Sequence, residues 1–448
     1  MLSPPKLQAV RALVESVPDA TIVGLTHALA NSPPGGVLGP VREMVEVEAE
    51  ERSVRNIALA PIAGLCRGGR RVGRLVYPPR VLRRLWSGLK AQSPDLVAQA
   101  RGFGFDEFEN EETVAEQTLV FNALCSAAGD GLRARAQPDF AAAAEICDSA
   151  VKSGADSMAA CLDLAPIVRS SLPNLHDWMR RMDDDAATLT RLAFRDAVAL
   201  SQDAGPRFVE MLASRLETPW QTMRLLSTVM DHPSERYLAG SEMAGLANDV
   251  LADIDSQLAT LKAFDIKRSD RQAARAAARA VHDASLAISD FKACVQTARD
   301  GPMGARIAEQ KAAKAALVEA RLEMIDGLVA AALPLETIRF AGRMTKLAPR
   351  LTADPDMQLV QQAETALIFA EGLRPVAGTA GFGSARAKAL EAVNTRLANY
   401  SDDLLAHLRS EEASNLDRAR LYLDVAANLM ALSSDEQAAQ IIRRRAAA

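Results

Sequence analysis

Apolar side chains recur along nearly the whole chain at spacings of three and four residues, the pattern of α-helices with one buried face. Leu390, Val393 and Leu397 illustrate the spacing. No convincing run alternates apolar and polar residues in the way that is typical of a half-buried strand. We therefore predict an all-α fold, a multi-helix array. The regular distance between helix starts also allows a solenoid-like N-terminal half.

Several helix starts are marked by a proline or a capping residue next to an acidic one. Examples are Pro18-Asp19, Pro94-Asp95 and Asp356. Proline suits the first helical turn, where its missing N–H is not needed, and a carboxylate there meets the positive end of the helix dipole. Between residues 110 and 235 these signals predict longer helices. The side chains expected to point inward there are Val114, Phe121 and Cys125 in one helix and Leu189, Leu192 and Val198 in another.

The clearest pattern lies at 270–333, where seam positions alternate between spacings of four and three, a heptad repeat. The seam runs through Ala277, Val281, Ala284, Ile288, Phe291, Val295 and Ala298, and then through Ala308, Lys311, Ala315, Val318, Leu322, Ile325 and Val329. A Gly-Pro break at 299–304 separates the two halves. Two helices of about 30 residues, each roughly 45 Å long, must then lie antiparallel. We predict a long antiparallel helical hairpin of coiled-coil type whose interaction seam is Val281, Ile288, Phe291, Val295, Val318, Leu322 and Ile325.

Breaks in the pattern suggest four segments. They are a short-helix domain at 1–105, a helical domain at 106–235, the hairpin with a preceding helix at 236–335, and a C-terminal helical bundle at 336–448.

Composition narrows the class of protein. Aromatic residues make up only 4% of the 448 residues, so Ala, Leu, Val and Met must fill an alanine-rich core. The net charge of −5 is too small for the chain as a whole to be a polyanion binder. The five cysteines form no Cys-x-x-Cys pair, and no apolar stretch approaches the roughly 20 residues that span a bilayer. We expect a cytoplasmic protein without a transmembrane segment, cofactor or resident metal.

Charge is most uneven at 52–90, where basic residues occur without a single Asp or Glu. The candidate binding residues of this basic segment are Arg67, Arg70, Arg71, Arg74, Arg80, Arg83, Arg84 and Trp86. Guanidinium groups grip phosphates and aromatic rings stack on bases, so nucleic acid or an anionic membrane is one interpretation. The other is that the acidic stretch at 106–116 neutralises the segment, or that an acidic partner protein docks on it.

The dipeptide His282-Asp283 is typical of the HD-type metal-dependent phosphohydrolases, which are all-helical. Such an enzyme also needs an upstream histidine, here His232, and a distant aspartate such as Asp354 or Asp356. A dipeptide match occurs often by chance. A flanking surface histidine is therefore the simpler interpretation of His282, and the hydrolase is an alternative.

The expected function is that of a non-enzymatic cytoplasmic scaffold or interaction protein. It would act through helix–helix contacts, with a protein partner or a second copy docking on the hairpin. Binding of nucleic acid or an anionic membrane by the basic segment stays open beside it, as does the metal site of His232, His282 and Asp283.

Overall fold

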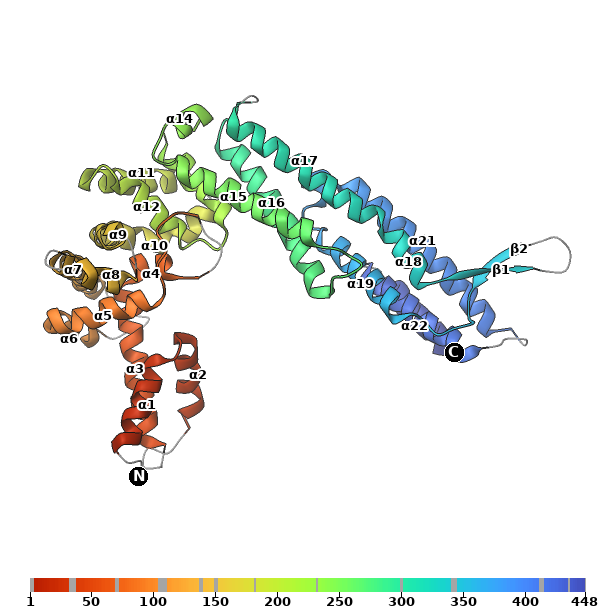
Figure 1. The fold of residues 1–448 in the computed structure, drawn as a ribbon, viewed down its shortest axis with the longest axis horizontal. Coiled ribbons are helices and arrows are strands. Elements are labelled where there is room, and N and C mark those ends of the chain that lie inside the picture. Colours follow the sequence, from red (N-terminus) through yellow and green to blue (C-terminus); the bar gives the residue numbers. More distant parts are fainter. Residues whose placement is uncertain are drawn as a thin grey trace. The chain divides into compact units, whose positions relative to one another are not determined.

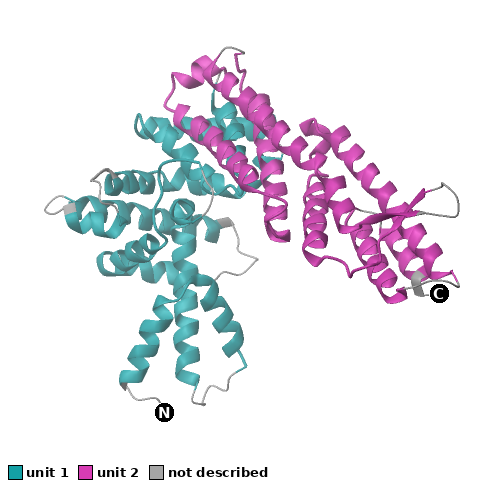
Figure 2. Cartoon of the chain, turned by 45° about the vertical axis from the view of Figure 1, so that its right-hand side comes forward, with its two compact units in different colours: residues 1–231 teal, residues 232–448 magenta. Residues whose placement is uncertain are grey.

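The structure is a computed structural model that describes residues 4–31, 38–68, 72–103, 111–136, 140–148, 152–180, 183–230, 233–298, 301–339, 345–410, 415–433 and 436–447. The prediction of an all-α, multi-helix fold is confirmed (Figure 1). None of the helices in these ranges combines the length and the apolar character needed to cross a bilayer. The chain divides into two compact units, unit 1 at Met1–Asp231 and unit 2 at His232–Ala448 (Figure 2).

Unit 1 is built from short helices that follow one another closely. They are α1 (Pro4–Ser16), α2 (Asp19–Leu29), α3 (Gly39–Ala58), α4 (Ala60–Ala63), η1 (Gly64–Cys66), α5 (Arg80–Gln92), α6 (Pro94–Gly102), α7 (Glu111–Ala136), α8 (Phe140–Cys147), α9 (Lys152–Asp163), α10 (Ala165–Arg180), α11 (Asp184–Leu200), α12 (Ala204–Ala213), η2 (Pro219–Gln221) and α13 (Thr222–Val229). The first three form an N-terminal cluster in which α1 and α2 both pack on α3, around a small core of Val14, Ile22 and Val45 (Figure 1).

Unit 2 has longer helices and one small hairpin of strands. Its elements are α14 (Glu235–Ala239), α15 (Ala244–Ala263), α16 (Arg271–Cys294), α17 (Pro302–Glu323), α18 (Ile325–Ala332), β1 (Leu335–Arg339), β2 (Thr345–Pro349), α19 (Met357–Gly372), α20 (Ala377–Ala380), α21 (Gly383–Leu408), α22 (Leu416–Leu432) and α23 (Glu436–Ala447). The antiparallel strands, with Leu335 opposite Pro349, were not expected from the sequence. Large side chains such as Leu335 and Leu347 are exposed there, so the strands lack the buried face that makes a strand pattern recognisable.

The face of α11 that is buried is the opposite of the predicted one. Leu189, Leu192 and Val198 were expected to point inward, but between 43% and 51% of their surface is exposed. The buried face carries small side chains instead, Ala186, Ala187, Thr190 and Ala197, and packs against α10, α12 and α13. Small side chains let neighbouring helices approach closely. The face of α11 that carries them is therefore buried, and the face with the larger apolar side chains is exposed. Val114 of α7 is likewise exposed, whereas Phe121 and Cys125 are buried as predicted.

The predicted hairpin exists as α16 and α17, but its helices are shorter than expected and are not each other's main partners. They have 24 and 22 residues, and a break at Met324 separates α17 from α18. The helix α15 packs against both, more extensively than they pack on each other. Before Val318, the buried positions of α17 include Ile307, Gln310 and Lys314. The seam is therefore shifted by one residue from the predicted Ala308, Lys311 and Ala315.

Glu235 secures the connection between α16 and α17. Its buried carboxylate accepts hydrogen bonds from the backbone N–H groups of Ala298 (3.0 Å) and Met303 (2.7 Å). The second bond caps the first turn of α17, whose own N-cap residue, Gly301, provides no side-chain cap. A carboxylate at this end of a helix is also favoured by the helix dipole.

We expect Glu235→Ala to lower the free energy of unfolding of unit 2 by about 2 kcal/mol, because two backbone donors lose their acceptor. Urea unfolding followed by far-UV circular dichroism measures this change. Glu242→Ala, which changes an exposed glutamate between α14 and α15, is the control. Equal unfolding midpoints for the two variants would contradict the capping role.

Candidate functional site

The first arginines of the basic segment are turned into the protein. Arg52 is 5% exposed and Arg55 is 7% exposed. Arg52 donates to Asp19 (2.9 Å) and to Glu48 (2.6 Å), and Arg55 donates to the other carboxylate oxygen of Asp19 (2.7 Å). Both guanidinium groups therefore hold the N-terminal cluster together and are not available to a phosphate.

The arginines of α5 contact other segments of unit 1. Arg80 forms an ion pair with Asp148, and Arg84 lies 3.7 Å from the same carboxylate. Arg83 donates to the backbone carbonyl of Glu15 at 3.0 Å. The guanidinium groups of these three arginines are thus paired within the chain, although their charge made the segment a candidate for nucleic-acid or membrane binding.

Trp86 is buried and cannot stack on an external base. Its indole Nε1–H donates to Glu51 at 3.1 Å, and the same carboxylate pairs with Lys90 (2.5 Å) and Arg101 (3.0 Å). Burial by itself would raise the pKa of Glu51, but the bonds and charges of Lys90, Arg101 and Trp86 outweigh it and hold this pKa below its usual value.

The remaining candidates of the basic segment are Arg67, Arg70, Arg71 and Arg74. Arg70 and Arg71 lie outside the described residues, as does 104–110, which contains three of the six carboxylates of the acidic stretch at 106–116. Arg67 and Arg74 are exposed. Neither forms an ion pair with another residue that the structure describes.

The hairpin seam is inside unit 2. Its members are all 5% exposed or less: Val281, Ile288, Phe291, Val295, Val318, Leu322 and Ile325. The chain's own helices cover these side chains. In this fold the seam is therefore part of the core of unit 2, and docking of a partner helix on it stays a prediction.

The residues of the alternative metal site are not brought together in the described part of the chain. His232 lies outside it, and His282 Nδ1 is 3.5 Å from the carboxylate of the adjacent Asp283. Asp354 pairs with Arg418 at 2.8 Å, and Asp356 caps α19. Among the described residues, no three His, Cys, Asp or Glu side chains form a group that could hold a metal ion.

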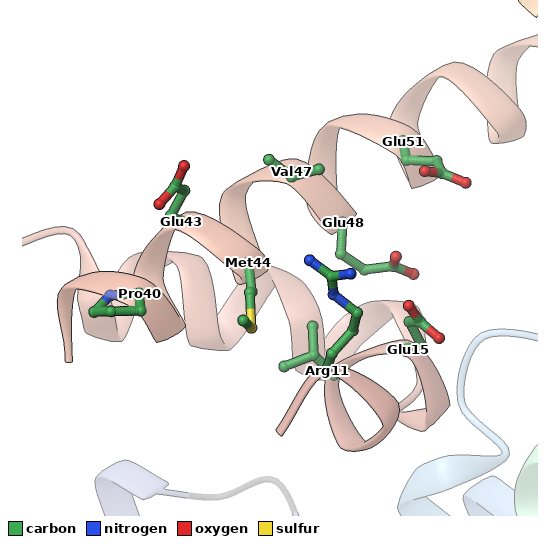
Figure 3. A pocket seen from close by; sticks show the side chains of 9 residues that line it. Arg11, Glu15, Pro40, Glu43, Met44, Val47, Glu48 and Glu51 are labelled. Carbon is green, nitrogen blue, oxygen red and sulfur yellow. The ribbon is translucent and has the colours of Figure 1, made fainter. Parts of the chain in front are cut away.

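A groove between α1 and α3, here called the α1–α3 groove, is a candidate binding site. Its central cavity has a volume of about 380 Å³. Figure 3 shows the lining side chains: Arg11, Val14 and Glu15 from α1, and Pro40, Glu43, Met44, Val47, Glu48 and Glu51 from α3. A second cavity of about 420 Å³ shares Arg11 and Met44 and adds Pro5, Leu7 and Gln8, so the groove continues toward the start of α1.

The helical period of the two segments creates this groove. In α3, Pro40, Met44, Val47 and Glu51 are spaced by four, three and four residues and so lie on one face. In α1, the spacing of Leu7, Arg11 and Val14 is four and three residues, so these side chains also share one face. Val14 and Val45 hold the helices together at the bottom, while Val47 keeps 58% of its surface exposed. The groove is therefore an apolar stripe left open to solvent.

Negative charge surrounds this stripe. Four glutamates, Glu15, Glu43, Glu48 and Glu51, face one arginine, Arg11. Glu48 and Glu51 are engaged with basic side chains, as described above. The carboxylates of Glu15 and Glu43 form no ion pair with the residues that the structure describes. They remain exposed at the edges of an apolar surface.

This site was not predicted from the sequence. The available signal was the stretch 40–51, where apolar residues with helical spacing are flanked by glutamates. That pattern also describes an ordinary half-buried helix. Only the incomplete covering by α1 and α2 distinguishes the two.

Comparison with protein-family models, with curated proteins and with solved structures finds no match to this chain.

Proposed function

We propose that this protein is a helical interaction protein, and that the α1–α3 groove binds a basic amphipathic helix of a partner protein. The observation that carries the proposal is the combination of an open apolar stripe with unpaired glutamates along its edges. The groove thereby takes the role that the sequence assigned to the hairpin seam.

The shape of the groove suits a helix. A partner helix placed between two helices contacts them through apolar side chains at positions i, i+3, i+4 and i+7. The 13 residues of α1 give the groove a length of about 20 Å, enough for nearly four turns of a partner. Met44 and Val47 offer the apolar contact, and Leu7 extends it toward the start of α1.

The charge of the groove selects the partner. Lys or Arg side chains flanking the apolar positions of a bound helix would lie near Glu15 and Glu43. An acidic helix would meet four glutamates and one arginine instead. Electrostatic complementarity of this kind favours the correct partner and speeds its association, and it weakens as salt screens the charges.

The proposal is tested with a designed amphipathic peptide of about 18 residues that contains Leu and Lys, labelled for fluorescence anisotropy and titrated with the full chain. We expect it to bind, with an affinity that falls as salt is raised. A peptide in which every Lys is replaced by Glu should bind at least about tenfold more weakly. Equal binding of the two peptides would refute the proposal.

Charge reversal in the groove gives the matching prediction. Glu15→Lys with Glu43→Lys should weaken binding of the Leu/Lys peptide at least about tenfold, since like charges then meet. Glu112→Lys with Glu116→Lys on α7 is the control, because it changes net charge equally outside the groove.

For the apolar contact, Val47→Ser should weaken binding of the Leu/Lys peptide severalfold. Val23→Ser on α2, where Val23 has a similar exposure of 56%, should not weaken it. Equal losses in the groove and control variants would show that the peptide binds elsewhere.

A further inference from the structure

A separate cavity of about 410 Å³ lies in unit 1 between the second half of α10 and the segment that leads from α12 into η2. Its apolar lining includes Leu175, Met179 and Trp220, each of which is less than 8% exposed. A cavity of this volume accepts a molecule of metabolite size. We call it the α10–η2 pocket.

Positive charge predominates among the polar groups of the pocket. Arg180, Arg215 and His176 line it together with one acid, Glu217. No ion pair or hydrogen bond joins the Arg215 side chain to another described residue, although it is partly buried. Burial, and after it the nearby positive charge of Arg67, lowers the pKa of Arg215. Arg215 is thus a partly buried cation without an ion-pair partner among the described residues.

The wall beside this charge also contains polar atoms without partners. The Trp220 Nε1 and Thr218 Oγ1 atoms are buried, and within the described residues neither makes a hydrogen bond. Such atoms cost free energy unless an acceptor or a water molecule reaches them. Arg224 lies 5.4 Å from the centre of the Trp220 ring and donates to the Met179 carbonyl, so a cation pairs with a carbonyl in the last turn of α10. This contact reduces the repulsion that a helix C-terminus would exert on an anion.

We propose that the α10–η2 pocket binds a small organic anion, a carboxylate or a phosphate monoester attached to an apolar body. Arg215 is the main anchor of the anionic group, with Arg180 and His176 at the opening. The apolar body packs against Trp220, Met179 and Leu175. This site does not depend on the α1–α3 groove, and either proposal can fail without the other.

The probes are phenyl phosphate, phenylacetate and benzyl alcohol, which have similar apolar parts and differ in charge. Each is titrated into the full chain by calorimetry at neutral pH. We expect at least one of the two anions to bind at least about tenfold more tightly than the neutral alcohol, because only an anion uses the guanidinium groups. The stronger of the two anions identifies the source, phosphate or carboxylate. If neither anion binds better than benzyl alcohol, the proposal is overturned.

Arg215→Gln should weaken binding of the better anion at least about tenfold. Arg195→Gln, an exposed arginine of α11 outside the pocket, is the matched control and should bind like the unchanged protein. A second variant, His176→Gln with Arg180→Gln, changes only exposed side chains and should weaken binding severalfold while circular dichroism shows an intact fold. Unchanged affinity in this second variant, or in a folded Arg215→Gln, would exclude the pocket as the site.

Discussion

Replacing Arg52 by Met is expected to lower the free energy of unfolding of the N-terminal cluster by about 3–5 kcal/mol, the usual cost of removing one partner from a buried charged network. Arg52 donates to the carbonyls of Val14 (3.0 Å), Glu15 (3.1 Å) and Val17 (2.7 Å). These lie at or just beyond the end of α1, where a helix leaves carbonyls without partners and a cation is favoured by the dipole. Met fills the same space but removes this donor from the Val14 and Val17 carbonyls, whereas the Glu15 carbonyl keeps its hydrogen bond from Arg83.

Asp19 depends on the same arginine. Burial would raise its pKa, but Arg55, Asn56 and Arg52 outweigh that effect and hold the pKa of Asp19 below its ordinary value. The stabilisation by this carboxylate is therefore complete above the unfolded pKa of about 3.9 and is lost as the pH falls through the lower folded value. At neutral pH, Arg52→Met weakens the stabilisation because one of its two guanidinium partners is gone.

Hydrogen exchange of the full chain measures this effect locally. The amides of α1 and α2 should exchange at least about a hundredfold faster in Arg52→Met. Glu50→Met is the control on the same helix, since this side chain is exposed and such surface changes alter the free energy of unfolding by less than about 0.5 kcal/mol. Unchanged protection of α1 in the Arg52 variant would show that the arginine is not the link between these helices.

The opposite result is expected for Lys314→Met, which should raise the free energy of unfolding of unit 2 by about 2 kcal/mol at neutral pH. Lys314 is 2% exposed, and its Nζ donates to Ser285 Oγ at 2.7 Å. Burial, together with the charge of Lys311, lowers the pKa of Lys314 to about 8. The ammonium group is thus still mostly charged at neutral pH in an apolar interface. Met removes that charge, and Ser285 keeps its hydrogen bond to the Val281 carbonyl.

The pH dependence identifies the lysine. Between the folded pKa of about 8 and the unfolded value of about 10.4, the unfolded chain holds a proton that the native state has released. Stability therefore rises with pH in this interval, by up to about 3 kcal/mol. The rise due to Lys314 should be absent from Lys314→Met and present in the control Lys292→Met, an exposed lysine of α16.

Far-UV circular dichroism and hydrogen exchange of α15–α17 are the suitable measurements. Tryptophan fluorescence is not, because Trp86, Trp178 and Trp220 all belong to unit 1. The difference between variant and unchanged protein cancels the other groups that titrate in alkaline solution. A variant that is less stable than the unchanged protein throughout this interval would contradict the argument.

The candidate site was only partly predictable because its features depend on which groups meet. The basic segment is visible in the sequence, but Arg52 and Arg55 are paired with Asp19, more than 30 residues earlier. The seam on α16 is recognisable, yet its covering helices come from α15 and α19, which local spacing does not indicate. The glutamates of the α1–α3 groove look like an ordinary solvated helix face until the open space beside Val47 is known.

By itself, the sequence determined the all-α class, many helix starts such as those at Asp19, Pro94 and Met357, and the buried stripe of α16. These features follow from interactions within a few residues, namely helical period, capping and the helix dipole. Tertiary structure decided which face of α11 is buried, that Gln310 and Lys314 lie inside, and which charges remain without partners. Those outcomes depend on close packing and on charge pairing between segments distant in the chain, which no local pattern records.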